Sequence, residues 1–250
     1  FALKHLAADV GIMVTASHNP PSDNGYKVYL GPRLLGADDP TGAYAQITSP
    51  TDQLIAANIH AWNIATQQPE LASSGWELIS QDISNDYVEA VSQFLGSVSS
   101  PVARSALNIV YTPLHGVGAG VFCHLMDATG FNTVSVVDQQ VDPDPAFPTV
   151  AFPNPEEPGA LDLAISTAGS LPETDLIIAH DPDADRLAVA VPVAGEWRRL
   201  SGDHVGLLVG ARLMPYLAAN NLAISNSVVS APQLARLAAH HGVPHETTPT

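Results

Sequence analysis

The segment Asp181-Pro182-Asp183-Ala184-Asp185-Arg186 places three carboxylates at alternate positions between two apolar runs. These runs, 176–179 and 187–191, are typical of buried strands, so the acids belong to the loop that joins them. Like charges this close together repel, and a hard divalent cation that takes oxygen ligands is their natural counter-charge. The arginine that follows indicates an anion held beside the metal, and phosphate fits best.

Three other interpretations of the acidic loop compete with a metal site next to a phosphate. A calcium hand is excluded, because Arg186 and Pro192 stand where that motif needs glycine and a bidentate glutamate. An aspartyl-phosphate enzyme would use Asp181 as its nucleophile, which leaves Asp185 and Arg186 without a role. A solvated acidic turn remains open as an alternative on this pattern alone.

A second loop, residues 17–25, is dense in turn-forming residues and lies between predicted strands at 11–16 and 26–30. Ser17 follows the end of the first strand, with His18 beside it and Lys27 on the next strand. This pattern favours a surface loop that carries chemistry. Asn24-Gly25 is by itself a hairpin signal, so a plain turn is the alternative. Ser17 has no Gly-x-Ser-x-Gly elbow, which disfavours a hydrolase.

A third loop, Pro113-Leu114-His115-Gly116-Val117-Gly118, stands between a predicted strand at 107–110 and a predicted helix at 119–129. Such a loop can aim backbone N–H groups at a phosphate. A glycine-rich turn between strand and helix explains the pattern equally well.

Composition narrows the classes of partner. The 250 residues have 46% hydrophobic content and a formal net charge of −16, which predicts one or two α/β domains and argues against nucleic acid and anionic membranes as partners. A phosphate site must therefore be built locally, from Lys27, Arg186, a metal and backbone N–H groups. No apolar run approaches the ~20 residues that span a bilayer. The single Cys123 fits a reducing compartment, so we expect a cytoplasmic protein.

Hydrophobic periodicity and turn residues predict alternating strands and helices, which is α/β order. Further helices are expected at 51–64, 85–95, 161–168, 203–218 and 232–240, and further strands at 133–137 and 227–229. The segment 96–101 is the best linker candidate, and a new unit is expected to begin near Gly195.

Together these motifs resemble the α-D-phosphohexomutase superfamily: Thr-Ala-Ser-His-Asn-Pro at 15–20, the His115 loop, and the acidic loop, in this order along the chain. The segments 24–29, 147–150, 153–157, 195–197 and 201–203 look most like the branch that contains phosphoglucomutase-2 and phosphopentomutase. Proline and alanine in the metal loop replace glycines of many relatives, but the ligands are kept.

The resemblance implies repeated three-layer α/β domains with mixed sheets. Residues 1–100 would be the C-terminal part of domain I, 101–194 domain II, and 195–250 the start of domain III, with domain IV absent. We therefore expect a fragment of a four-domain enzyme, a poor catalyst alone, and the missing domains leave the sugar and the oligomeric state open.

The resemblance also implies roles for single residues. Ser17 would be a phosphoserine that completes a site for one Mg²⁺ with Asp181, Asp183 and Asp185. Lys27 is the expected general acid/base, with His18 assisting. Substrate or phosphate binding is expected of Arg186, His115 and Asn24.

The implied reaction moves a phosphoryl group between positions 1 and 6, or 1 and 5, of a sugar phosphate through a sugar bisphosphate. Glucose phosphate is the expected substrate, with mannose or pentose phosphate as alternatives. Two other hypotheses stay open: an aspartyl-phosphate phosphotransferase or phosphatase, and a fragment that binds metal and phosphate without turnover.

Overall fold

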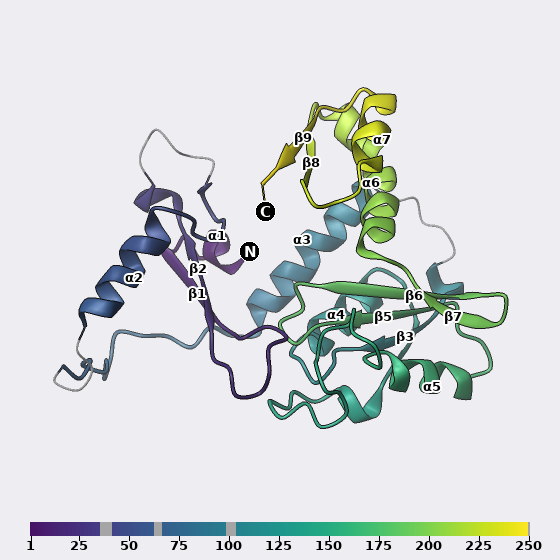
Figure 1. The fold of residues 1–250 in the computed structure, drawn as a ribbon, viewed down its shortest axis with the longest axis horizontal. Coiled ribbons are helices and arrows are strands. Elements are labelled where there is room, and N and C mark those ends of the chain that lie inside the picture. Colours follow the sequence, from purple (N-terminus) through teal and green to yellow (C-terminus); the bar gives the residue numbers. More distant parts are fainter. Residues whose placement is uncertain (36–41, 63–66, 99–103, 250) are drawn as a thin grey trace. The chain divides into compact units, whose positions relative to one another are not determined.

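The computed structural model describes residues 1–35, 42–62, 67–98 and 104–249, and its chain divides into two compact units. The first unit comprises residues 1–16 and 23–87, and the second comprises 17–22 and 88–250. Residues 17–22, the first part of the loop that the sequence predicts at 17–25, are thus grouped with the second unit although both flanking segments belong to the first. Figure 1 shows the chain coloured along its length.

The first unit is built on a two-stranded antiparallel sheet of β1 (Val10–Val14) and β2 (Tyr26–Leu30), in which Ile12 pairs with Val28. The short helix α1 (Ala2–His5), the 3₁₀ turn η1 (Pro32–Leu34) and the helix α2 (Thr51–Ala61) accompany it. The helix α3 (Asp82–Val98) crosses the boundary between the two units. It passes through Gly96 to Val98, so the first three residues of the linker expected at 96–101 are helical, and the other three lie outside the described residues.

The second unit contains a five-stranded mixed sheet in the order β4-β3-β5-β6-β7. β3 (Asn108–Thr112) is parallel to β4 (Thr133–Val136) and to β5 (Leu176–His180), whereas β6 (Leu187–Val193) is antiparallel to both β5 and β7 (Glu196–Arg199). The parallel pairs need crossovers, which are supplied by α4 (Ala119–Ala128) and α5 (Asp162–Ser170). The turns η3 (Arg104–Ala106) and η4 (Asp138–Gln140) complete the connections.

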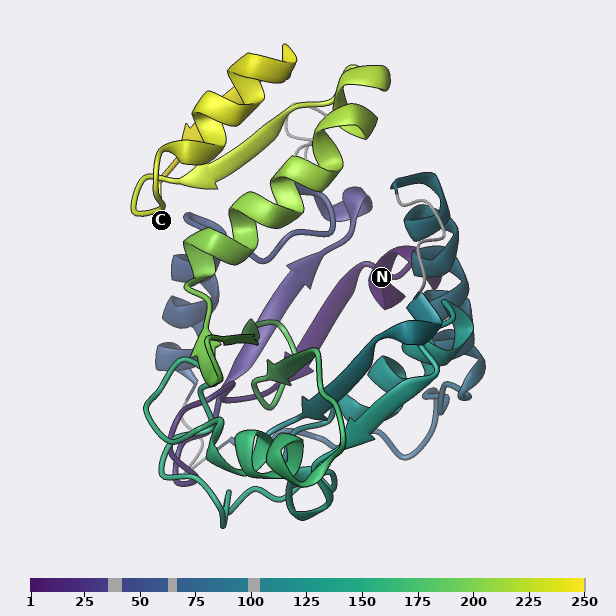
Figure 2. The same cartoon turned by 90° about the vertical axis from the view of Figure 1, so that its right-hand side faces the viewer.

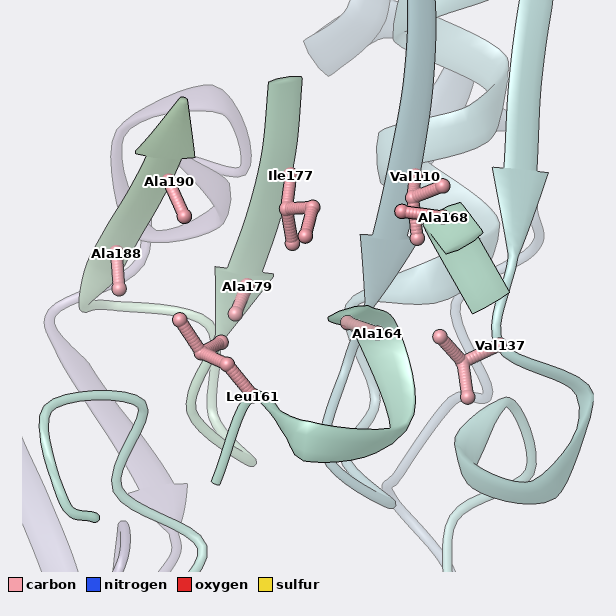
Figure 3. Close-up of a cluster of buried hydrophobic side chains, with 9 residues drawn as sticks. All are labelled: Val110, Val137, Leu161, Ala164, Ala168, Ile177, Ala179, Ala188 and Ala190. Carbon is pink, nitrogen blue, oxygen red and sulfur yellow. The ribbon is translucent and has the colours of Figure 1, made fainter. Parts of the chain in front are cut away.

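Both faces of this sheet are covered. Successive strand residues point to opposite faces, yet Ile109, Val110, Tyr111 and Thr112 are all buried, as a covered parallel strand requires. On one face Tyr111 stacks on Phe122 of α4, with ring centroids 3.9 Å apart. On the other face aliphatic side chains of β3, β5 and β6 pack against Leu161 and α5 (Figure 3). The expected three-layer α/β arrangement with a mixed sheet is confirmed.

The C-terminal part of the second unit forms a separate small core. The helices α6 (Gly202–Ala219) and α7 (Gln233–His241) pack beside a parallel pair of strands, β8 (Ile224–Ser227) and β9 (His245–Thr248). Figure 2 shows the yellow-green helices next to this pair. Met214, Leu217, Ala238 and Val243 are its buried residues. Gly242 ends α7 at φ 68°, a left-handed conformation that costs glycine little.

The expected boundary at 194/195 lies in the turn of a β-hairpin, because β6 and β7 pair across Gly195 and the sheet continues to Arg199. The division of the chain into three mutase segments stays a prediction. Within the described residues, no helix combines the length and the apolar character that a membrane crossing needs.

Candidate active site

The loop after β1 brings Ser17 to the acidic loop. Ser17 has a φ of 54°, an uncommon conformation for a residue other than glycine, and such residues often lie at functional sites. Its hydroxyl donates to Asp181 Oδ2 at 3.0 Å and to Asp183 Oδ1 at 3.2 Å. These carboxylates are 164 and 166 residues away along the chain, so only the tertiary fold creates this cluster.

The acidic loop is the connection of an antiparallel hairpin. β5 ends at His180 and β6 begins at Leu187, so Asp181 and Asp183 emerge directly from the end of a buried strand. The backbone N–H of Ala184 donates to the carbonyl of Asp181 at 2.9 Å, and that of Arg186 donates to its Oδ1 at 3.0 Å. These bonds hold the loop in a tight turn.

The three acids experience different environments. Asp181 is fully buried, Asp183 is nearly so, and Asp185 is exposed. Burial raises the pKa of Asp181, and the neighbouring Asp183 raises it further, against the opposing effects of the Arg186 N–H and the Ser17 hydroxyl. A carboxylate in this position is therefore costly to ionise without a nearby cation.

The donor set fits a divalent cation. Asp181, Asp183 and Asp185 each offer one oxygen, and these oxygens lie within 4.8 Å of one another. Three convergent carboxylates suit a hard ion such as Mg²⁺, which binds oxygen ligands. The Ser17 hydroxyl donates a hydrogen bond but adds no positive charge, so the negative charge of the cluster remains for a cation to offset.

His18 lies beside the serine. Its Nδ1 is 3.1 Å from Ser17 Oγ and 3.7 Å from Asp181 Oδ2, and its side chain is 23% exposed. A histidine at hydrogen-bonding distance from a hydroxyl can exchange a proton with it, because an imidazole nitrogen can donate or accept a hydrogen bond.

An aromatic cluster holds the end of β5 immediately before Asp181. His180 Nδ1 lies 3.1 Å from the hydroxyl of Tyr111, and both rings contact Phe122. Burial raises the pKa of Tyr111 and lowers that of His180, which favours a neutral hydrogen-bonded pair. The end of β5, from which Asp181 emerges, is therefore held by the packing of these aromatic side chains as well as by pairing in the sheet.

The other predicted site residues lie in several places. Arg186 contributes its backbone N–H to the loop, while its side chain is exposed. Lys27 on β2 and the exposed Asn24 belong to the first unit, so their roles stay predictions. His115 is buried, and its Nε2 lies 2.8 Å from Thr149 Oγ1. Its role as a phosphate ligand also stays a prediction.

Sequence reasoning missed two polar residues that contact each other near the His115 loop. Gln140 and Thr149 hydrogen-bond to each other behind the His115 loop, at 2.8 Å between Gln140 Nε2 and Thr149 Oγ1. Neither residue belongs to a spacing pattern that indicates chemistry. Only the resemblance of the segment 147–150 to relatives pointed to this region.

Comparisons with known proteins find related chains and matching family domains. Residues 1–53 match "Phosphoglucomutase/phosphomannomutase, alpha/beta/alpha domain I", and residues 85–195 match domain II of the same family. The chain is 40% identical over 251 residues to a "Probable phosphomannomutase" of Haemophilus influenzae, covering all of this chain and 49% of that protein. It is 37% identical over 282 residues to the phosphoribomutase of Saccharomyces cerevisiae, covering all of this chain and 42% of that protein.

The fold also has solved counterparts. A phosphoglucomutase/phosphomannomutase family protein of Burkholderia thailandensis superposes with a TM-score of 0.65 at 24% identity, covering 97% of this chain and 45% of that one. The present chain thus spans less than half the length of each of these relatives. With the two matched family domains and the relatives at this identity, the chain belongs to the phosphoglucomutase/phosphomannomutase family of the phosphohexomutase superfamily.

Proposed function

We propose that this chain carries the phosphoserine and metal-binding parts of a phosphosugar mutase. The observation that supports this most is the position of Ser17 Oγ, which hydrogen-bonds to both Asp181 and Asp183. A phosphoryl group on that oxygen would lie beside the acid cluster, where a bound cation could share its charge. A phosphoserine adds strong acceptor oxygens, so it would strengthen such a metal site.

Asp181, Asp183, Asp185 and the phosphorylated Ser17 would hold one Mg²⁺. When bound, this ion supplies charge neutralisation for the moving phosphoryl group, the main requirement in phosphoryl transfer. The chain itself orients the carrier: a left-handed Ser17 in a loop that packs with the second unit directs its hydroxyl at the acids.

In the proposed transfer, one bond from phosphorus to oxygen forms as another breaks. A sugar hydroxyl oxygen forms a bond to phosphorus as the bond from phosphorus to Ser17 Oγ breaks, which gives a sugar bisphosphate. The sugar hydroxyl loses its proton to a base and Ser17 gains one. Return of the other phosphoryl group to Ser17 restores the enzyme. His18, 3.1 Å from Ser17 Oγ, is the proposed proton carrier at the serine, and Lys27 the proposed general acid/base at the sugar.

For the substrate we propose a hexose phosphate, with glucose 1-phosphate and glucose 6-phosphate as the first pair to test. The family description names both phosphoglucomutase and phosphomannomutase, and the relatives above are named for mannose and ribose phosphates. Mannose 1-phosphate and ribose 1-phosphate are therefore the alternative substrates, and a sugar 1,6-bisphosphate is the proposed activator.

The test is a coupled assay of the natural protein that contains this chain, run with each sugar 1-phosphate, Mg²⁺ and a bisphosphate activator. Wild type is expected to turn over one substrate, and Ser17→Ala to lose nearly all activity while its circular dichroism is unchanged, because Ser17 lies in a loop. Ser170→Ala, at an exposed position at the end of α5, is the matched control. Near-normal turnover by Ser17→Ala would rule out the serine carrier.

Two other results would favour the alternatives. Turnover that persists in Ser17→Ala but disappears in Asp181→Asn would favour an aspartyl-phosphate enzyme, since the carboxylate would then be the nucleophile. Metal binding at the acids with no turnover of any sugar phosphate by the natural protein would favour a binding protein.

A further inference from the structure

A ring of hydrogen bonds connects the end of β3 to the loop that carries His115. The hydroxyl of Thr112, at the end of β3, donates to Gln140 Oε1 at 2.6 Å, and Gln140 Nε2 donates to Thr149 Oγ1 at 2.8 Å. Thr149 Oγ1 lies 2.8 Å from His115 Nε2. Thr112 and Gln140 are fully buried and His115 is 5% exposed, so these partners replace water for polar groups in the interior.

This ring fixes the shape of the loop that carries His115. Leu114 and His115 both have positive φ, 49° and 60°, which is strained for residues with a side chain and persists only where surroundings impose it. Three backbone bonds supply that constraint: Leu114 N–H donates to Thr112 Oγ1 at 3.1 Å, His115 N–H to the Gln140 carbonyl at 3.0 Å, and Asp144 N–H to the His115 carbonyl at 3.0 Å.

The same loop touches the acidic loop at Pro182. The backbone N–H of Val117 donates to the Pro182 carbonyl at 2.9 Å. A Cβ atom added to Gly116 would overlap the backbone of Pro182, so this approach requires glycine. Pro182 stands between Asp181 and Asp183, the two carboxylates that accept from Ser17.

From this arrangement we propose that His115 is a positioning residue. With Thr149 and Gln140, it holds Gly116 and Val117 against Pro182, and thereby sets how Asp181 and Asp183 converge on the metal. The inference rests on the proposed function of the acids as metal ligands. It gives the buried His115 a role different from phosphate binding, because its Nε2 already lies 2.8 Å from Thr149 Oγ1.

The test uses the 250-residue chain with Mn²⁺ as the probe, because free Mn²⁺ is measured directly by electron paramagnetic resonance. Thr149→Val removes the hydroxyl while keeping the shape, and it is expected to weaken Mn²⁺ binding about tenfold, as loss of groups that orient ligands does. Thr149→Ser restores the hydroxyl and is expected to stay within about twofold of wild type, a rescue that a purely structural defect would not show.

Glycine substitutions test the backbone contact. Gly116→Ala is expected to weaken Mn²⁺ binding by at least about tenfold, because Pro182 must move. Gly120→Ala is the control, since a Cβ there meets no atom within 4 Å. Thermal unfolding with a chelator present reports the fold of each variant separately from its metal affinity.

The outcomes separate this inference from the proposed function. If wild type binds Mn²⁺ and Asp181→Asn abolishes that binding, the metal site stands. Unchanged affinity in Thr149→Val, or an equal loss in Thr149→Ser, then overturns the positioning role alone. No Mn²⁺ binding by wild type would overturn both. In the natural enzyme, Thr149→Val is expected to need more Mg²⁺ for activity with an unchanged KM for the sugar phosphate.

Discussion

At the scale of single residues, the site is a concentration of negative charge organised around one hydroxyl. Asp181 is fully buried and accepts from Ser17 and from the Arg186 N–H, while Asp183 and Asp185 complete the cluster. The acid cluster could be predicted from the sequence, because three carboxylates at alternate positions after an apolar run repel one another and favour a bound cation. The contacts of Gln140 and Thr149 could not, because they depend on loops that meet only in the folded chain.

The ionised carboxylate of Asp181 should destabilise the folded chain when no metal is bound. Burial and Asp183 raise its pKa above the ordinary value of 3.8, so the folded state binds the proton more tightly than the unfolded state does. The stabilisation that this proton gives to the folded state is therefore full at low pH. It is lost as the pH rises through the raised pKa of Asp181.

Asp181→Asn removes this dependence. At pH 7 with a chelator, the variant is expected to be more stable than wild type by about 1 kcal/mol, the scale of a typical single substitution. Urea unfolding between pH 4 and pH 8 measures the difference, and Asp185→Asn, at an exposed position, is the control with a smaller effect. A wild type that equals or exceeds Asp181→Asn at pH 7 would contradict this account of the charge cluster.

At the scale of elements, patterns in the sequence predicted the segments whose own side chains decide their structure. The apolar runs of β5 and β6 were placed nearly as observed, since both strands are buried through their middle residues. β7 was missed, because Glu196-Trp197-Arg198-Arg199 has no strand pattern of its own and is extended through its pairing with β6.

The strand β8 was misplaced for the opposite reason. The apolar pair Val228 and Val229 suggested a strand at 227–229, but the strand is Ile224–Ser227 and both valines are more than half exposed. A short apolar run predicts burial only where the fold supplies a covering layer, and periodicity alone does not reveal that layer.

The core of the five-stranded sheet should dominate the stability of the second unit. Ile177 on β5 is fully buried against Leu161 and α5, so Ile177→Ala is expected to lower the unfolding free energy by roughly 3 kcal/mol through lost burial and a cavity. Val193 on β6 is 44% exposed, and Val193→Ala is expected to cost less than about 1 kcal/mol. Chemical denaturation measures both, and equal costs would show that this cluster is not the core.

At the scale of the whole molecule, the chain consists of two compact units, and the serine loop is grouped with the unit that carries the acids. Sequence patterns could not predict this grouping of the serine loop, since residues 17–22 are bounded on both sides by the first unit. The family resemblance, carried by motifs distant in sequence, did indicate that Ser17 and the acids act together. The resemblance implies that Ser17 belongs to one domain and the acids to the next. The order of the motifs along the chain does not predict how the segments that carry them pack.

Local stability should differ along the second unit. β8 and β9 form a sheet of only two strands, with Val228 and Val229 exposed beside it, whereas β3 lies between two partners under two helical layers. Backbone amides of β8 and β9 are therefore expected to exchange with solvent faster than those of β3. Hydrogen–deuterium exchange by mass spectrometry compares them, and equal or greater protection in β8 and β9 would contradict this expectation.

Mapping the phosphorylated residue shows whether Ser17 carries the phosphoryl group beside the acids. The natural protein that contains this chain is incubated with glucose 1,6-bisphosphate and Mg²⁺, digested, and analysed by mass spectrometry. We expect one phosphate, on the peptide containing Ser17, stable to hydroxylamine and absent from Ser17→Ala. A hydroxylamine-labile phosphate on the Asp181 peptide, or phosphate on any residue other than Ser17, would contradict it.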